Sequence, residues 1–440
     1  MKFPGEILMG AQSRLLPPSV PYRFFVTAVI FHVVAWALIA YSADSVVGFT
    51  GGSGPILSAV HALTLGVFIM TIMGASFQLL PVATGKALMA VWPCRVASWL
   101  YIPGVAALLY GFAAGEYVFM AVGGVMSVAA MIVFAALVGD VLRRSGSGLK
   151  LPVMYGWGGM ASLFALTALG FAMIVDQKYG FLLADVDFRL AHMIIAVYGF
   201  MGMSAIGYSH ILVPMFALSQ APDEAQGVIN FTMHAAVLVL AVGAVSAGSH
   251  AALLMAAAGA VAVSGLYIRT MNQTLKQGMR KKLGLSFVLI RGAWGMLPLS
   301  LAVGAMACEG FFGAQGAVLF VFLALFGWLL TFLLGILQRI IPFLAAMNAG
   351  REDGTPPRLS DLADEAPLKI HAVCHFSALA LVSWGIISDH GGIVMAGGIA
   401  GLGGSLAYLW FTLDVLRRFA KFRLKGGNVG TKQQLNKGTV

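Results

Sequence analysis

The chain has 440 residues, of which 60% are hydrophobic and only 10% are charged. So small a polar fraction cannot cover a water-soluble core of this size, so the composition excludes a soluble globular protein and indicates a chain solvated by lipid. The formal net charge is +10. We attribute it to membrane topology and to attraction by anionic lipid, and we assign nucleic acid no role.

Twelve apolar stretches of about 20 residues follow one another, each long enough to cross about 30 Å of hydrocarbon. Charged residues are absent from the middle of most of them, and a backbone in lipid must satisfy its own hydrogen bonds, which predicts helices. The stretches begin near Phe24, Ile56, Val91, Tyr117, Pro152, Ala191, Ile229, Ala251, Leu285, Ala314, Leu368 and Gly391. The predicted fold class is therefore an all-α membrane protein with twelve transmembrane helices.

The distribution of Lys and Arg predicts the orientation of these helices. If both termini are cytoplasmic, only Lys178 and Arg189 of the 27 basic residues lie outside, as expected when positive loops stay on the inner side. Residues 421–440 then form a basic cytoplasmic tail, and residues 348–365 form a polar cytoplasmic loop. We expect the protein in the cytoplasmic (inner) membrane of a bacterium.

The second, sixth and tenth stretches share the pattern G-x7-G-x6-P. Glycines eight apart lie on nearly one helix face and allow another helix to approach closely, while the proline ends or kinks the helix. Small residues and terminal prolines are also common in membrane helices in general, which is the alternative explanation. The three sets are Gly66, Gly74 and Pro81; Gly199, Gly207 and Pro214; and Gly327, Gly335 and Pro342.

The spacing of this pattern predicts an internal repeat. The prolines lie 133 and 128 residues apart, and four helices fit in each interval, so the repeats have the same orientation. A second echo is D-V-L-R-R, which ends the fourth stretch at Asp140–Arg144 and the twelfth at Asp414–Arg418. We therefore predict one transmembrane domain over residues 1–440, made of three parallel four-helix units at roughly 23–145, 152–270 and 285–420.

Two stretches resemble a known family: H-A-L-T-L-G through F-Q-L-L-P at His61–Pro81, and R-L-A-H through G-Y-S-H-I-L-V-P-M-F at Arg189–Phe216. With twelve helices in three four-helix units, they resemble the catalytic subunit of haem-copper oxidases, in particular the cbb-type oxidase and NnrS-like branch. The resemblance implies a fold like oxidase subunit I. It also implies an axial haem histidine on the second helix, copper ligands on the sixth and seventh, and histidines for both haems on the tenth.

The tenth stretch departs from that family. Residues Val321–Pro342 contain no histidine, so the usual partner of His61 and the proximal ligand of an oxygen-reducing haem are missing. Asp and Glu are also absent from the middle of the predicted spans, where a proton relay would need them. We therefore do not expect a standard oxygen-reducing proton pump.

His61 and His192 are the candidate axial ligands of a b-type haem. They lie 20 and 22 residues before their respective prolines, which predicts a similar depth near the outer face. Two imidazoles at one level on neighbouring helices can clamp a haem iron from both sides. The alternative is that each histidine only forms a hydrogen bond to a neighbouring residue.

Four further histidines are candidate copper ligands. His371 and His375 are four residues apart and so share a helix face, a spacing that suits one metal ion. With His210 or His234 at similar depth, they could form an imidazole copper site. The alternative is that His371 and His375 simply begin a helix beside an acidic loop.

The first functional hypothesis is a divergent oxidase-like protein that binds b-type haem, with copper as a second candidate cofactor. It would serve electron transfer, nitric-oxide-linked chemistry or metal-centre assembly, with membrane lipid and a cytochrome or other redox subunit as partners. If it is an enzyme, it is an oxidoreductase. Two alternatives stay open: a twelve-helix transporter of small solutes, against which the four-helix period argues, and a cofactor-free structural or assembly subunit.

Overall fold

The computed structural model describes residues 15–146, 149–183, 186–349 and 357–437, with side chains up to Arg423 in the last helix. Over these ranges the chain is all-α and has twelve helices long and apolar enough to cross a membrane. The predicted fold class is confirmed. The helices begin within a few residues of the predicted positions, because the length of an apolar stretch is a local property of the sequence.

Nine of the twelve described spans are single continuous helices. They are α2 (Ser19–Tyr41), α6 (Trp92–Ala114), α7 (Tyr117–Arg144), α8 (Lys150–Tyr179), α11 (Glu224–Ser246), α12 (His250–Gln277), α13 (Leu285–Cys308), α17 (Ala366–Ile387) and α18 (Gly391–Lys437). Two short helices, α3 (Ala43–Val47) and α16 (Leu359–Leu362), lie in connections. Since α18 continues to Lys437, most of the predicted tail at 421–440 prolongs the last helix, and residues 438–440 lie outside the described residues.

The second, sixth and tenth spans each contain a π-helical segment between two α-helical parts. The π segments each include the first glycine of the repeated pattern and end 12, 13 and 12 residues before its proline. π-helical turns are rare, so three at one position of the pattern agree with the predicted repeat. The spans are α4–η2–α5 (Pro55–His61, Ala62–Ile69, Met70–Thr84), α9–η4–α10 (Phe188–Ile194, Ile195–Met201, Gly202–Ala217) and α14–η5–α15 (Gln315–Phe322, Leu323–Leu330, Thr331–Asn348).

The glycines of the pattern pack against the first helix of their own unit. A Cβ at Gly66 would lie 2.5 Å from Phe31 Cγ, and one at Gly74 would lie 2.7 Å from Phe24 Cβ, both on α2. Only glycine allows this approach without displacement of the neighbouring ring. The corresponding glycines of the other two units lie against α8 and α13: Gly199 against Ser162, Gly207 against Tyr155 and Gly335 against Ile290 are equally close, whereas a Cβ at Gly327 would meet Met296 at an ordinary 3.5 Å.

The D-V-L-R-R echo also has the same structure at both places. Asp140 forms ion pairs with Arg143 (3.4 Å) and Arg144, and Arg144 donates to the Ala87 carbonyl (2.8 Å) in the connection after α5. At the end of α18 the corresponding contacts are Asp414 with Arg417 (2.8 Å) and Arg418 (2.6 Å), and Arg418 with the Asp361 carbonyl (3.5 Å).

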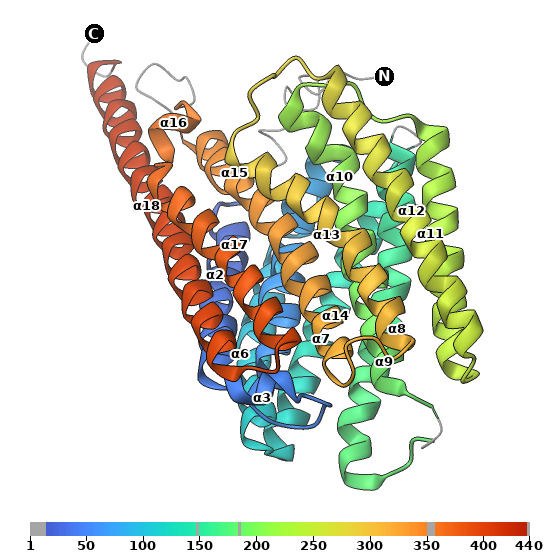
Figure 1. Ribbon diagram of the computed structural model, residues 1–440. Helices are drawn as coiled ribbons and strands as arrows, with labels where there is room; N and C mark the ends of the chain where they lie inside the picture. The colour runs from blue at the N-terminus through green and yellow to red at the C-terminus, as the bar shows by residue number, and fades with distance from the viewer. Residues whose placement is uncertain (1–14, 147–148, 184–185, 350–356, 438–440) are drawn as a thin grey trace.

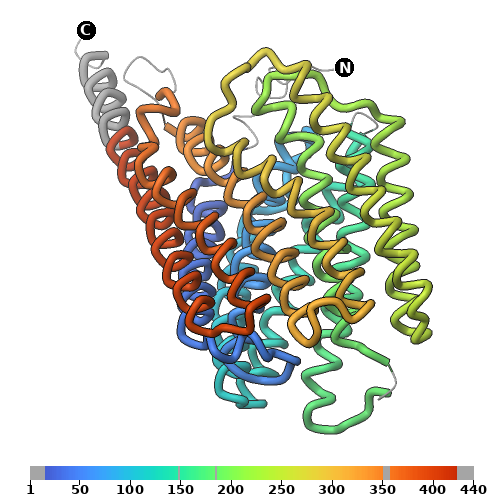
Figure 2. The backbone as a smooth tube through the Cα atoms, in the orientation of Figure 1, coloured from blue at the N-terminus to red at the C-terminus, as the bar shows by residue number. Residues whose placement is uncertain are grey.

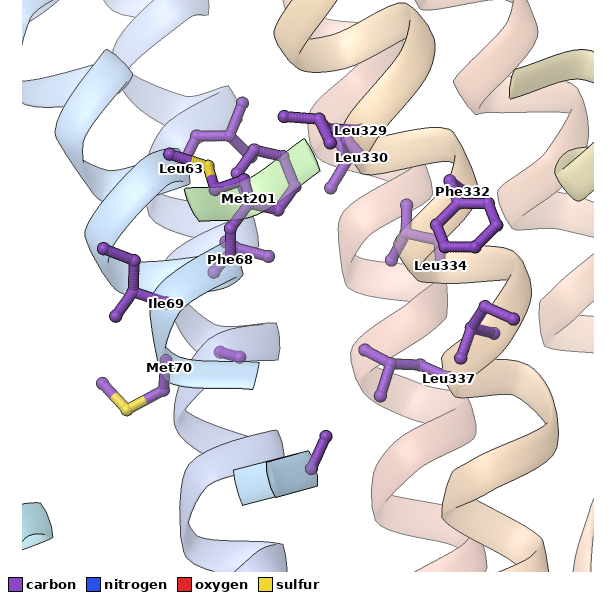
Figure 3. Close-up of a cluster of buried hydrophobic side chains, with 14 of the residues drawn as sticks. Leu63, Phe68, Ile69, Met70, Met201, Leu329, Leu330, Phe332, Leu334 and Leu337 are labelled. Carbon is purple, nitrogen blue, oxygen red and sulfur yellow. The ribbon is translucent and has the colours of Figure 1, made fainter. Parts of the chain in front are cut away.

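The three interrupted spans form the centre of the bundle. They are the most deeply buried of the twelve, and η5 contacts both η2 and η4. The other nine helices surround them, and α18 packs along α2, so that the end of the chain closes the ring (Figures 1 and 2). Apolar side chains such as Leu63, Met201 and Leu330 fill the space around the central segments (Figure 3).

Candidate haem, metal and ligand sites

The six candidate histidines lie in three places, each with different neighbouring residues. His61 and His192 lie near one end of the second and sixth spans. His210 and His234 lie on two sides of Tyr155, and His371 and His375 lie beside His32. The sequence predicted the first pair as a unit, but it joined the other four histidines into one set that the structure divides.

His61 and His192 occupy corresponding places in their spans. His61 is the last residue before η2, and His192 lies three residues before η4. His61 Nδ1 bonds the Leu57 carbonyl at 2.9 Å. A carbonyl can only accept, so Nδ1 carries the proton and Nε2 keeps a lone pair for a ligand.

The surroundings of this pair are apolar and close. The His61 ring packs on Phe112 with the ring centroids 4.5 Å apart. The His192 ring lies against α8 at Gly170, where a Cβ would come within 2.9 Å of its Cε1 atom. His192 Nδ1 is buried and has no partner in hydrogen-bonding geometry, although the Leu166 carbonyl is near. A buried ring nitrogen without a partner calls for an explanation, such as a ligand or an ordered water.

Two basic side chains lie near the histidine-bearing ends of these spans, at the end of the bundle predicted to face outside. Arg189, three residues before His192, donates to the Thr50 carbonyl (3.3 Å) just before the second span. Lys178 lies over the ring of Tyr117, 5.4 Å from its centroid, and Tyr117 packs on the apolar cluster that includes Phe112. Both basic side chains are exposed. Lys178 and Arg189 are also the two basic residues that the sequence predicts to lie outside. The spacing of residues along the sequence does not relate them to His61 and His192.

His371 and His375 form a buried cluster with His32 of α2. The ring centroids of His371 and His375 are 5.4 Å apart, and those of His32 and His371 are 6.1 Å apart. At most 1% of each side chain is exposed. His371 Nδ1 donates to the Gly404 carbonyl at 3.1 Å, and His375 Nε2 bonds Thr331 Oγ1 at 2.7 Å. His32 is not among the predicted copper ligands, because no periodicity in the sequence relates α2 to α17.

The cluster offers two buried, unpartnered ring nitrogens that could bind a metal, Nε2 of His371 and Nδ1 of His375, but no third. His32 Nε2 accepts the indole N–H of Trp36 (3.1 Å), so its proton is on Nδ1, which offers an N–H and no lone pair. Among the described residues, no three His, Cys, Asp or Glu side chains are grouped so that they could hold a metal ion. The predicted copper set of His210, His234, His371 and His375 is also split between two places. We therefore derive no chemistry through copper.

His210 and His234 belong to the second unit and differ in what they face. His210 Nδ1 donates to the Ile206 carbonyl (2.8 Å), and its ring stacks on Tyr155. His234, on α11, bonds the Tyr198 carbonyl through Nε2 at 2.9 Å. His234 also lines a cavity of about 330 Å³. His210 does not line this cavity.

No protein-family model matches the chain, and no curated protein does. The geometry of these sites is therefore the basis for any function assigned to the chain.

Proposed function

We propose that this protein is a multi-pass membrane protein that holds one b-type haem between His61 and His192 and transfers electrons. The observation that carries the proposal is that two half-buried imidazoles lie at corresponding places in two units, each beside a π-helical segment. Nε2 of His61 keeps a lone pair for a ligand, while His192 Nδ1 is buried without a partner in hydrogen-bonding geometry. The resemblance to haem-copper oxidases supports His61 as a haem ligand, whereas the pairing with His192 on the sixth span rests on the repeat alone.

The chain's own groups would do four things for such a cofactor. His61 and His192 would ligate the iron, and the Leu57 carbonyl would hold the His61 ring in the required tautomer. Phe112 would exclude water from one side of His61. Lys178 and Arg189 would pair with the carboxylates of the haem edge at the membrane surface. Bis-imidazole haem supplies one-electron transfer at iron, without an open coordination position for oxygen.

The third unit supports electron transfer over dioxygen reduction. At the place that corresponds to His61, 20 residues before the proline, it has Phe322, which lies near Trp36 and Phe326 in an aromatic group. An aromatic hydrocarbon ring cannot ligate iron. We place the protein in the bacterial inner membrane with both termini in the cytoplasm and a cytochrome or other redox subunit as its electron partner.

A haem assay of the purified protein tests this proposal. Protein made in haem-supplemented cells and purified in mild detergent should show a low-spin spectrum and about one haem per chain by pyridine haemochrome. His61→Ala and His192→Ala should each lose the low-spin spectrum and most of the haem.

The matched control is His250→Ala. His250 also lies at the predicted outer end of a helix, but it is exposed and pairs with Glu309 at 2.8 Å. This variant should keep its haem. Folded wild-type protein without haem after growth in supplemented medium would overturn the proposal and favour the cofactor-free or transporter alternatives.

A further inference from the structure

The π-helical segments of the first two units are bonded by side chains at the same position of the repeated pattern. Tyr101 of α6 donates to the Leu65 carbonyl of η2 at 3.1 Å. His234 of α11 bonds the Tyr198 carbonyl of η4 through Nε2 at 2.9 Å. Leu65 and Tyr198 each lie one residue before the first glycine of the pattern. In both units, therefore, the third helix donates to the same backbone oxygen of the second helix.

The third unit reaches the corresponding carbonyl through one additional hydroxyl. Phe326, the residue before Gly327 in η5, accepts from Thr331 Oγ1 at 2.9 Å. The same hydroxyl bonds Nε2 of His375, on α17, at 2.7 Å. The single hydroxyl proton goes to the carbonyl, so His375 donates through Nε2, as His234 does. The contact from the third helix to the π-helical segment is therefore present in all three units.

The three donors occupy corresponding places on their helices. Tyr101 and His375 are each the tenth residue of their helix, and His234 is the eleventh. Tyr101 and His234 each lie 20 residues after the proline of their unit, Pro81 or Pro214. All three side chains are buried. A phenol and two imidazoles have little in common except an O–H or N–H at the end of a ring, so the hydrogen bond is what the three units share.

A π-helical turn determines how the two halves of a span are rotated relative to each other. Its carbonyls accept from the N–H five residues on instead of four, so the turn holds one residue more than an α-helical turn. If it became α-helical, the outer half would rotate by about 100° and move by about 1.5 Å relative to the inner half. The inner half is fixed by close packing, as at Gly207 against Tyr155. The rotation would therefore move the outer ends, which carry His61 and His192.

We infer that Tyr101 and His234 are positioning residues for the proposed haem ligands. Their hydrogen bonds stabilise the π-helical turns, and these turns determine which way His61 and His192 face. The inference rests on the proposed function for what the two histidines bind, but not for the bonds or the rotation. In the third unit the residue before the π-helical segment is Phe322, which cannot ligate iron, so the corresponding bond there contributes only to the fold.

Cysteine crosslinking measures this rotation without haem. The three native cysteines are free and can be replaced by serine. In that chain, Gly170→Cys should face His192→Cys, because a Cβ at position 170 lies 2.9 Å from the His192 ring. A short bis-methanethiosulfonate should join this pair faster than it joins Gly170→Cys to Met193→Cys. The ratio of the two rates reports which residue of the sixth span faces α8.

Variants of His234 test whether its hydrogen bond sets this ratio. An α-helical turn would hold one residue fewer, so Met193 would move into the place of His192. His234→Leu should therefore lower the ratio by about threefold to tenfold, the effect of one hydrogen bond. His234→Gln, whose amide N–H lies near the position of Nε2, should restore it. An unchanged ratio in folded His234→Leu protein, or equal slowing of both reactions, would show that the bond only satisfies a buried carbonyl and would overturn the inference.

The haem spectrum gives a second readout in the first unit. Tyr101→Phe removes one hydroxyl and keeps the ring, and it should lower the ratio of low-spin to high-spin haem by about threefold to tenfold. The matched control is Thr331→Val, which breaks the corresponding bond in the third unit and should keep the wild-type ratio. Equal ratios in the two variants would contradict the inference. If the wild-type protein holds no haem, the proposed function fails, while the crosslinking ratio still decides whether His234 sets the rotation.

Discussion

At the scale of single residues, the hydrogen bonds of the buried imidazoles carry the most functional information. His61, His210 and His371 each bond a backbone carbonyl through Nδ1, whereas His234 does so through Nε2. This bond decides which nitrogen keeps the lone pair. It is set by the position of a carbonyl on the same or another helix, so residue identity alone cannot indicate it.

Thr331 illustrates how much one buried hydroxyl can stabilise. It bonds the Phe326 carbonyl (2.9 Å) beside the π-helical segment and also His375 Nε2 (2.7 Å). Thr331→Val would remove both bonds and leave His375 Nε2 buried without its partner. We expect a loss of about 1–3 kcal/mol in the free energy of unfolding, measured by detergent denaturation. The control is Thr232→Val, because Thr232 is exposed on α11 and bonds only a carbonyl of its own helix. If the two variants were equally stable, the two bonds of Thr331 would contribute nothing.

At the scale of helices, the repeated glycines determine how the centre of each unit is assembled. In each unit they bring the interrupted helix against the first helix, and the π-helical segment lies between the outer end and the second glycine. The sequence predicted the glycine faces correctly. It gave no sign of the π segments, because their widened turns depend on partners such as Tyr101, which donates to the Leu65 carbonyl (3.1 Å).

Gly66→Ala tests the helix interface. The added Cβ would meet Phe31 at 2.5 Å, so Phe31 or the backbone must shift. Overpacking of this kind costs about 1–3 kcal/mol, and we expect a lower midpoint of thermal unfolding. Gly265→Ala is the matched control, since a Cβ there meets nothing within 4 Å. Equal midpoints for the two variants would show that close approach at Gly66 is not needed.

At the scale of the whole molecule, the three units pack against one another and meet at η2, η4 and η5. This arrangement brings together residues from distant parts of the chain: His32 beside His371, and Tyr198 beside Trp328. The candidate haem pair lies within the first two units, and the cavity lies between the second and third. The sites are therefore properties of how units pack, not of any one unit.

The native cysteines test the predicted orientation of the bundle. Cys308 is exposed at the end predicted to face outside, while Cys94 is buried and Cys374 is half-buried. A membrane-impermeant maleimide applied to intact spheroplasts should label the wild-type protein, and Cys308→Ser should remove the label. Labelling of Cys308 only after permeabilisation would invert the proposed topology.

The sequence by itself determined the number of helices, their approximate limits and the repeated glycine faces, and it predicted that His61 and His192 occupy corresponding places in two units. Hydrophobic length and residue spacing are local quantities, and they survive folding unchanged. Only the tertiary structure decided that His32 joins His371 and His375, that His210 and His234 lie apart from them, and that a cavity opens beside His234. These contacts join helices that no period relates, so they follow from how the units pack against one another.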